Sequence, residues 1–271
     1  MDNNEVLEVL RKATEELRKS REQINNLLES FDNLDRVRDA YHSRYPADGS
    51  RFGEKGVIYS AIIGNYDSIN EPEVKSENID YVLFSDRDIP DYSGVWDIRV
   101  LNNEMKLSNQ RLARWVKMHP FDLFPDHDWS LWIDGSLRIK KDIWRYIITY
   151  SRKSGMLCFP HHIFKNIREE ADAIVAYGKA NEKELDEQIR IYEEDGYKSK
   201  GYIAETGVLL RDHHDKKLHE VMDSWWEELC SYEHNRDQMS FDYICWKYGY
   251  EYDLNDLLIY GNPYIEAVTM H

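Results

Sequence analysis

A short apolar run that ends in a carboxylate limits the possible folds of this chain more than any other feature: residues 129–133, followed by Asp134, Gly135 and Ser136. Large and β-branched residues in such a run predict a buried central strand, which the Asp-Gly pair ends. Because open α/β sheets bind ligands just beyond the carboxyl ends of their strands, Asp134 is a candidate ligand-binding residue. Carboxylate and hydroxyl oxygens suit Mg²⁺ or Mn²⁺ carrying a diphosphate, so Asp134 and Ser136 are predicted metal ligands. The alternative is that Asp-Gly simply turns the chain.

Further strands and helices are expected to alternate on both sides of this run. Strands are predicted over residues 57–63, 81–84, 96–100, 129–133, 156–159 and 203–210. Helices are predicted over residues 106–119, 138–152, 166–195, 214–232 and 238–248, and residues 257–271 are expected to be irregular. Alternation of this kind predicts an α/β domain with a mostly parallel central sheet flanked by helices.

The first 46 residues have a different pattern and form a predicted segment of their own. Apolar residues there follow the alternating spacing of a heptad seam, with polar Thr14 and Arg21 inside it: Leu7, Leu10, Leu17, Ile24, Leu28 and Phe31. A long helix with so narrow an apolar stripe needs a partner, so we predict a coiled coil that makes a homo-oligomer through residues 1–46. The alternative is that this helix packs on its own domain. Residues 47–55 are a predicted linker, and residues 56–271 the α/β domain.

Composition excludes several classes of partner. The formal net charge is -16, which argues against nucleic acid or an anionic membrane surface as the main partner. The three cysteines are widely spaced and fit a reducing compartment better than a disulfide framework. With no apolar run of 18 residues and a polar N-terminus, we expect no transmembrane segment and a cytoplasmic protein.

Four ordered motifs resemble the bacterial and plant glycosyltransferase-like family catalogued as domain of unknown function 616: Tyr59–Asp67, Phe84–Asp86, Trp132–Ser136 and Arg236–Phe241. More distantly, the motif order is similar to that of glycosyltransferase family 8, which has the GT-A fold and uses nucleotide-sugar donors with Mn²⁺. The resemblance implies a GT-A-like, Rossmann-like sheet and a donor that is a nucleotide sugar, with a UDP-sugar favoured. It also implies an acceptor hydroxyl on a glycan or polysaccharide precursor. The usual Asp-x-Asp of that fold is Asp-Gly-Ser in this chain.

Several residues are predicted to bind the nucleoside of the donor. The loop after the first strand would meet the base, through backbone groups near Ala61, Ile63, Asn65 and Tyr66. A carboxylate after the second strand, Asp86, would bind the ribose hydroxyls, unless it only caps a turn.

Three cations precede the central strand and are candidates for the donor diphosphate. Arg111, Arg114 and Lys117 fall at i, i+3 and i+6 of the predicted helix, broadly along one face. Arginine can bind phosphate oxygens with two nitrogen atoms at once. Gly135 would contact the same donor. The alternative is a solvated basic face.

The sugar and the acceptor are predicted to meet residues from later motifs. His161 follows a predicted strand end, and Glu205 and Thr206 resemble the family 8 segment that meets the donor sugar. Each has a structural alternative, as a turn residue or as a polar residue of an edge strand.

Asp237 and Gln238 are the predicted catalytic pair. Asp237 precedes a predicted helix, so it could cap that helix or act as general base in an inverting reaction. Gln238 would lie on the reacting face in a retaining reaction, as the resemblance to family 8 suggests. The resemblance also makes His271 a candidate third metal ligand.

Other classes of function stay open at this stage. A nucleotidyltransferase or a nucleotide-sugar hydrolase could use the same sheet, metal and cations. A non-catalytic coiled-coil scaffold with a sugar-binding domain is a further alternative. The sequence has neither a P-loop nor a dinucleotide fingerprint, which argues against ATPases and dinucleotide oxidoreductases.

Overall fold

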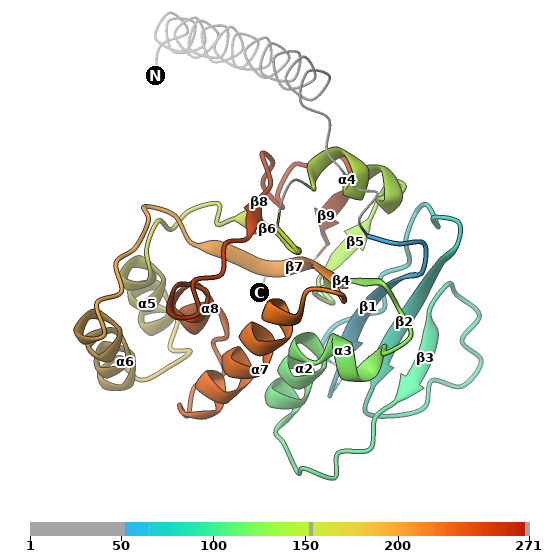
Figure 1. Cartoon of the computed structure of the whole chain (residues 1–271). Helices are drawn as coiled ribbons and strands as arrows, with labels where there is room; N and C mark the ends of the chain where they lie inside the picture. The colour runs from blue at the N-terminus through green and yellow to red at the C-terminus, as the bar shows by residue number, and fades with distance from the viewer. Residues whose placement is uncertain (1–51, 65, 152–153, 269–271) are drawn as a thin grey trace, which may run out of the picture. The chain divides into compact units, whose positions relative to one another are not determined.

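A computed structural model describes residues 52–64, 66–151 and 154–268 of the chain (Figure 1). The predicted N-terminal helix, Asn65 and His271 lie outside the described residues, so their roles stay predictions. Within these ranges, no helix is both long and apolar enough to cross a membrane.

A seven-stranded sheet, in the order β3-β2-β1-β4-β7-β6-β8, organises the described residues. Its strands are β1 (Gly56–Ile62), β2 (Ile79–Ser85), β3 (Asp97–Val100), β4 (Trp129–Ile133), β6 (Met156–Pro160), β7 (Ala204–Asp212) and β8 (Asp253–Leu254). Pairing is parallel between β3 and β2, β2 and β1, β1 and β4, and β6 and β8, which confirms the mostly parallel sheet. Only β7 runs antiparallel to its neighbours β4 and β6. This reversal brings the start of β7 beside the carboxyl end of β4.

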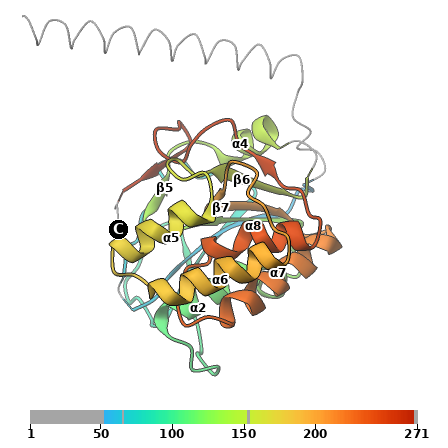
Figure 2. The same cartoon turned by 90° about the vertical axis from the view of Figure 1, so that its left-hand side faces the viewer.

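Helices cover both faces of the sheet (Figures 1 and 2). They are α2 (Asn109–Met118), α3 (Pro120–Leu123), α4 (Ile143–Tyr150), α5 (Ile167–Ala176), α6 (Glu182–Glu194), α7 (Lys216–Cys230) and α8 (Gln238–Lys247). The core on one face includes residues of α2, α5, α6, α7 and α8. The core on the other face includes residues of α4 and of the small sheet of β5 (Leu137–Ile139) and β9 (Ile265–Ala267). Helices on both sides explain why the strands are continuous apolar runs.

Strand β1 shows how the sequence pattern produces this layering. All of its residues are buried, and they alternate between the faces: Val57 and Tyr59 join one core, and Ile58 and Ile62 join the other. The Tyr59 hydroxyl donates to the Lys117 backbone oxygen at 2.9 Å, which fixes the end of α2 against the sheet. The helix that carries the predicted diphosphate-binding cations is therefore held in place by β1.

Three predicted elements differ from the structure. The expected helix over 166–195 is two helices, because Gly178 has a φ of +64° that no α-helix contains and Asn181 caps a new start. The expected helix over 138–152 begins only at Ile143, since residues 137–139 pair with β9 instead. The segment 257–271, expected to be irregular, contributes β9. In addition, Phe52 within the predicted linker is fully buried in the core.

Candidate active site

The candidate site lies at the carboxyl end of β4, where β7 begins. Asp134 directly follows β4, and its backbone N–H donates to the Gly207 carbonyl at 2.9 Å. Its Oδ1 accepts the indole N–H of Trp132 at 2.6 Å, so a core residue orients the carboxylate. A Cβ on Gly207 would come within 3.3 Å of the Asp134 Oδ2, and glycine leaves that space open. One oxygen of Asp134 is thus fixed, and the side chain as a whole is 34% exposed.

A buried cluster of ion pairs, formed by Arg114, Lys117 and Asp237, lies next to Asp134. Lys117 Nζ lies 2.5 Å from Asp237 Oδ2, 3.0 Å from the Thr206 hydroxyl and 4.0 Å from Asp134 Oδ1. Arg114 Nε lies 2.8 Å from Asp237 Oδ1. The side chains of Lys117 and Asp237 are only 1% and 6% exposed. A buried charge is tolerated only when it is paired, and here two cations share one carboxylate.

The position of Asp237 limits what its carboxylate can do. Asp237 occupies the cap position of α8, but its side chain makes no capping hydrogen bond, so the alternative that it serves as a helix cap is wrong. Burial raises the pKa of Asp237, yet Arg114 and Lys117 outweigh it and hold that pKa well below its usual range. A carboxylate that both cations occupy is a weak proton acceptor. The Asp237 carboxylate instead holds Arg114 and Lys117 in place through ion pairs. Gln238, the next residue, is half-buried at the start of α8.

The three predicted cations do not act together. Arg111 binds the segment before α8: its Nε donates to the Asn235 side chain at 2.9 Å, and its guanidinium also donates to the Tyr232 carbonyl. Lys117 is enclosed by the cluster behind the site. Arg114 is 25% exposed, and Asp134 is among the charges that act on its pKa. Arg114 is therefore the member of the three that can reach a ligand.

Glu205 is the electrostatically strained residue of the site. Burial, with the charges of Asp134 and Glu170 adding to it, raises the pKa of Glu205 to about 7. Its Oε2 is buried without a hydrogen-bond partner among the described residues, although His162 Nδ1 lies 3.4 Å away. A buried polar atom left unsatisfied costs free energy and marks a functional candidate.

His161 and His162 have separate roles. The His161 side chain is 7% exposed, and its Nδ1 accepts the backbone N–H groups of Ile163 and Phe164 at 3.1 and 2.9 Å. Burial, helped by the charges of His162 and Arg236, lowers the pKa of His161 to about 4, so His161 is neutral and holds the loop after β6. The structure thus gives the predicted sugar-binding His161 a structural place and brings its neighbour His162 next to Glu205 instead.

Tyr260 packs against His162 and is a residue that the sequence analysis missed. Its ring centroid lies 4.3 Å from that of His162, and Glu205 and Asp134 add to the effect of burial in raising its pKa. Tyr260 belongs to a segment without regular structure between β8 and β9, so no periodic pattern could have singled it out.

The predicted nucleoside residues lie at the ends of β1 and β2. Ile62 pairs with Ser85 in register, so Ile63 and the exposed Asp86 follow at neighbouring strand ends, as expected. Ala61 and Ile63 are buried, and Tyr66 is exposed. Beside them a small hollow includes Ser60, Ile62, Asn70 and Gly135 in its lining. The Ser60 hydroxyl is buried there without a partner among the described residues.

Gly135 fits closely between two loops. The Asn70 side-chain amide donates to the Gly135 carbonyl at 2.6 Å. A Cβ on Gly135 would lie 3.0 Å from Asp67 Oδ2 and 3.3 Å from Ile62 Cγ1, so a larger residue would push the loop after β1 away. Gly135 therefore lies between Asp134 and the small hollow beside the predicted nucleoside residues.

The protein groups available to a metal are few. Within the described ranges, no three His, Cys, Asp or Glu side chains are grouped to hold an ion. Asp134 offers one oxygen, since the other already accepts the Trp132 N–H. Ser136 follows two residues after Asp134 and is half-buried. Mg²⁺ commonly uses one or two carboxylates together with substrate phosphates, so this donor set fits an ion shared with a diphosphate.

Glu205 provides a stability test of the site. Its pKa of about 7 exceeds the usual value of 4.5, so folding takes up a proton between these pH values and stability falls as pH rises through them. Glu205→Gln removes the charge, and we expect unfolding free energy to rise by about 1–3 kcal/mol at pH 8 and to change little at pH 4.5. Urea unfolding at both pH values measures this. The exposed Glu220→Gln on α7 is the control; equal effects of the two variants at pH 8 would contradict the prediction.

Asp134 at a strand end, the partly exposed Arg114 and Glu205 with its raised pKa are groups that suit an anionic ligand and a polar substrate. The model of the TOD1/MUCI70 glycosyltransferase-like domain matches residues 53–258. The chain therefore belongs to this glycosyltransferase-like family, and the predicted resemblance is confirmed at that level. The finer resemblances, to the family catalogued as domain of unknown function 616 and to family 8, stay predictions.

A plant relative supports the same class. The chain is 24% identical over 215 residues to a protein of Arabidopsis thaliana described as "Probable hexosyltransferase MUCI70". The aligned region covers 69% of this chain and 36% of that relative, so the chain spans little more than a third of its length. The matched domain includes Asp134, Glu205 and Asp237, the residues around which the site is built.

Proposed function

We propose that this glycosyltransferase-like domain moves a hexose from a nucleotide-diphosphate sugar, with a UDP-sugar favoured, to a hydroxyl of a glycan. The observation that carries this proposal is the meeting of Arg114, Asp134 and Glu205 at the junction of β4 and β7. Arg114 and Asp134 suit the diphosphate end of such a donor, and Glu205 suits its sugar end.

Departure of the diphosphate is the step that most needs electrostatic stabilisation. Negative charge builds on the leaving oxygen, and groups already fixed in place stabilise it without reorganising. Asp237 fixes Arg114 through a 2.8 Å ion pair, so the guanidinium keeps its position when a ligand enters. A divalent ion held by Asp134 would add positive charge at the leaving oxygen. Ser136 and His271, which is outside the described residues, are further candidate ligands for that ion.

The sugar end needs hydrogen-bond acceptors and the removal of one proton. Glu205 accepts sugar or acceptor hydroxyls and, with a raised pKa, is a stronger base than an ordinary carboxylate. His162 and Tyr260 cover Glu205 from the loops after β6 and β8. Thr206, held by Lys117 and Asp237, fixes the start of β7 from which Glu205 projects. This arrangement favours Glu205 over Asp237 as the proton acceptor.

A ligand-dependent melting experiment tests the proposal. UDP-glucose and UDP-galactose with Mn²⁺ are expected to raise the melting temperature, because a ligand at 100 times its dissociation constant adds about 2.7 kcal/mol of stability. GDP-mannose is the matched control and should shift it less. If none of these nucleotides changes the melting temperature, the proposed donor class is wrong. UDP release at the same rate with and without glycan would instead indicate hydrolysis.

A further inference from the structure

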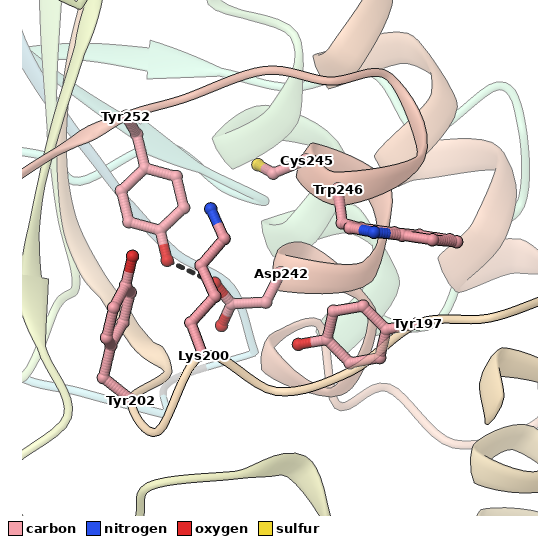
Figure 3. A pocket seen from close by; sticks show the side chains of 7 residues that line it. All are labelled: Tyr197, Lys200, Tyr202, Asp242, Cys245, Trp246 and Tyr252. Carbon is pink, nitrogen blue, oxygen red and sulfur yellow. Dashed lines mark hydrogen bonds between the residues drawn. The ribbon is translucent and has the colours of Figure 1, made fainter.

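A second hollow lies outside the candidate active site, among α8, the loop before β7 and the residue before β8 (Figure 3). Four aromatic side chains, one carboxylate and one ammonium line it: Tyr197, Tyr202, Trp246, Tyr252, Asp242 and Lys200. Neither the diphosphate end nor the sugar end of the proposed donor site uses any of these residues. Aromatic walls with a few fixed polar groups are typical of small-molecule sites.

Asp242 is the polar centre of this hollow. Its Oδ1 accepts the Tyr252 hydroxyl, and its Oδ2 accepts the Ala204 backbone N–H at 3.0 Å. Burial raises the pKa of Asp242 to about 6. A carboxylate has about four acceptor positions, so two bonds leave room for ligand hydroxyls. Figure 3 shows Tyr252 and Tyr197 on either side of Asp242, and the charge of Lys200 acts to lower the pKa of Asp242.

The remaining side chains decide which ligands fit. Lys200 lies among the rings, and its positive charge excludes a cationic ligand that the rings would otherwise attract. A purely apolar ligand would leave Asp242 and Lys200 without polar partners. Trp246 is 36% exposed and Tyr202 is half-buried, so ring surface remains available to a ligand. A molecule with apolar C–H faces and several hydroxyls, such as a pyranose sugar, satisfies all of these groups.

Residues of two elements, β7 and α8, lie at or next to both the hollow and the candidate active site. Ala204, whose N–H binds Asp242, is the neighbour of Glu205 on β7. Asp242 also follows Asp237 by five residues along α8, a rise of about 7.5 Å. A chain of sugars that presents one unit to Glu205 therefore has a next contact surface within a short span.

We propose that this hollow binds a neutral sugar unit of the acceptor glycan, beside the unit that receives the transferred hexose. The inference rests on the proposed function for its role, but binding of a sugar there can be measured without any donor. Tyr202 and Trp246 would stack on the ring of the bound sugar. Asp242 and Lys200 would bond its hydroxyls.

Calorimetric titration of the full chain with cellotetraose, xylotetraose and mannotetraose tests this. At least one tetrasaccharide should bind, and Trp246→Ala should weaken it about tenfold, the scale of one aromatic contact. Lys200→Ala should also weaken tetrasaccharide binding. Because Lys200 is exposed, this variant tests the site without the packing changes that Trp246→Ala could cause. Tyr177→Ala, at a ring that is 76% exposed on another element, is the control and should bind as the natural chain does.

Donor binding is measured on the same samples to separate the two proposals. UDP with Mn²⁺ should bind equally to the natural chain, Trp246→Ala and Lys200→Ala. If no tetrasaccharide binds the natural chain, or if both variants bind it unchanged, the hollow is not a sugar site. If sugars bind through the hollow while UDP does not bind at all, the sugar site is supported and the proposed function is overturned.

Discussion

Replacement of Asp237 by asparagine is expected to reduce both stability and sugar transfer. Asparagine has nearly the same size, but it leaves the buried Lys117 and the partly buried Arg114 without their shared carboxylate. Breaking a buried ion pair from one side costs about 3–5 kcal/mol, and we expect the lower end because Asp134 lies 4.0 Å from Lys117. Turnover should fall ~10²-fold, since Arg114 loses the group that fixes it. Urea unfolding and initial transfer rates measure the two effects.

The matched control is an aspartate in an exposed ion pair. Asp186 pairs with Arg168 on the surface, where the side chains are 57% and 46% exposed. Asp186→Asn should change stability by less than about 1 kcal/mol and leave transfer intact. The double variant Asp237→Asn with Lys117→Met should recover part of the lost stability without recovering activity, because it removes one uncompensated charge. If Asp237→Asn alone behaves like Asp186→Asn, the buried cluster has no energetic role.

The sequence predicts where strands end better than where side chains point. The run before Asp134 and the carboxylate after it specify a strand end, and parallel register then puts Asp86 beside Ile63. Both placements depend on local sequence patterns, and the folded structure has strand ends where those patterns predict them. The reversal of β7 is different, because the pattern of its residues is the same in either direction. That reversal is what brings Glu205 to Asp134.

The three cations of α2 show the same limit in detail. Residues at i and i+6 of a helix lie about 120° apart, because successive residues turn by about 100°. Arg111 and Lys117 therefore face different neighbours, one the loop before α8 and the other the buried Asp237. Sequence spacing alone described them as one broad face. What separates them is tertiary packing, which also determines that His162 and not His161 contacts Glu205.

Replacement of Asp134 by asparagine is expected to abolish most of the transfer while it leaves the fold intact. An asparagine oxygen can still accept the Trp132 N–H, so the strand end keeps its orienting bond. The lost charge removes the carboxylate that we propose for the divalent ion, and turnover should fall at least ~10²-fold. The Mn²⁺-dependent part of UDP affinity should disappear as well. Transfer assays and UDP titration with and without Mn²⁺ measure both.

Two comparisons make the Asp134 result specific. Asp126→Asn alters an exposed carboxylate just before β4, at the opposite end of the same strand, and should leave transfer and metal dependence unchanged. EDTA should lower UDP affinity of the natural chain to that of Asp134→Asn and should not lower the affinity of the variant further. Because the Asp134 charge helps to raise the pKa of Glu205, the variant should also titrate Glu205 at a lower pH. Full transfer and unchanged Mn²⁺ dependence in Asp134→Asn would mean that Asp134 only turns the chain after β4.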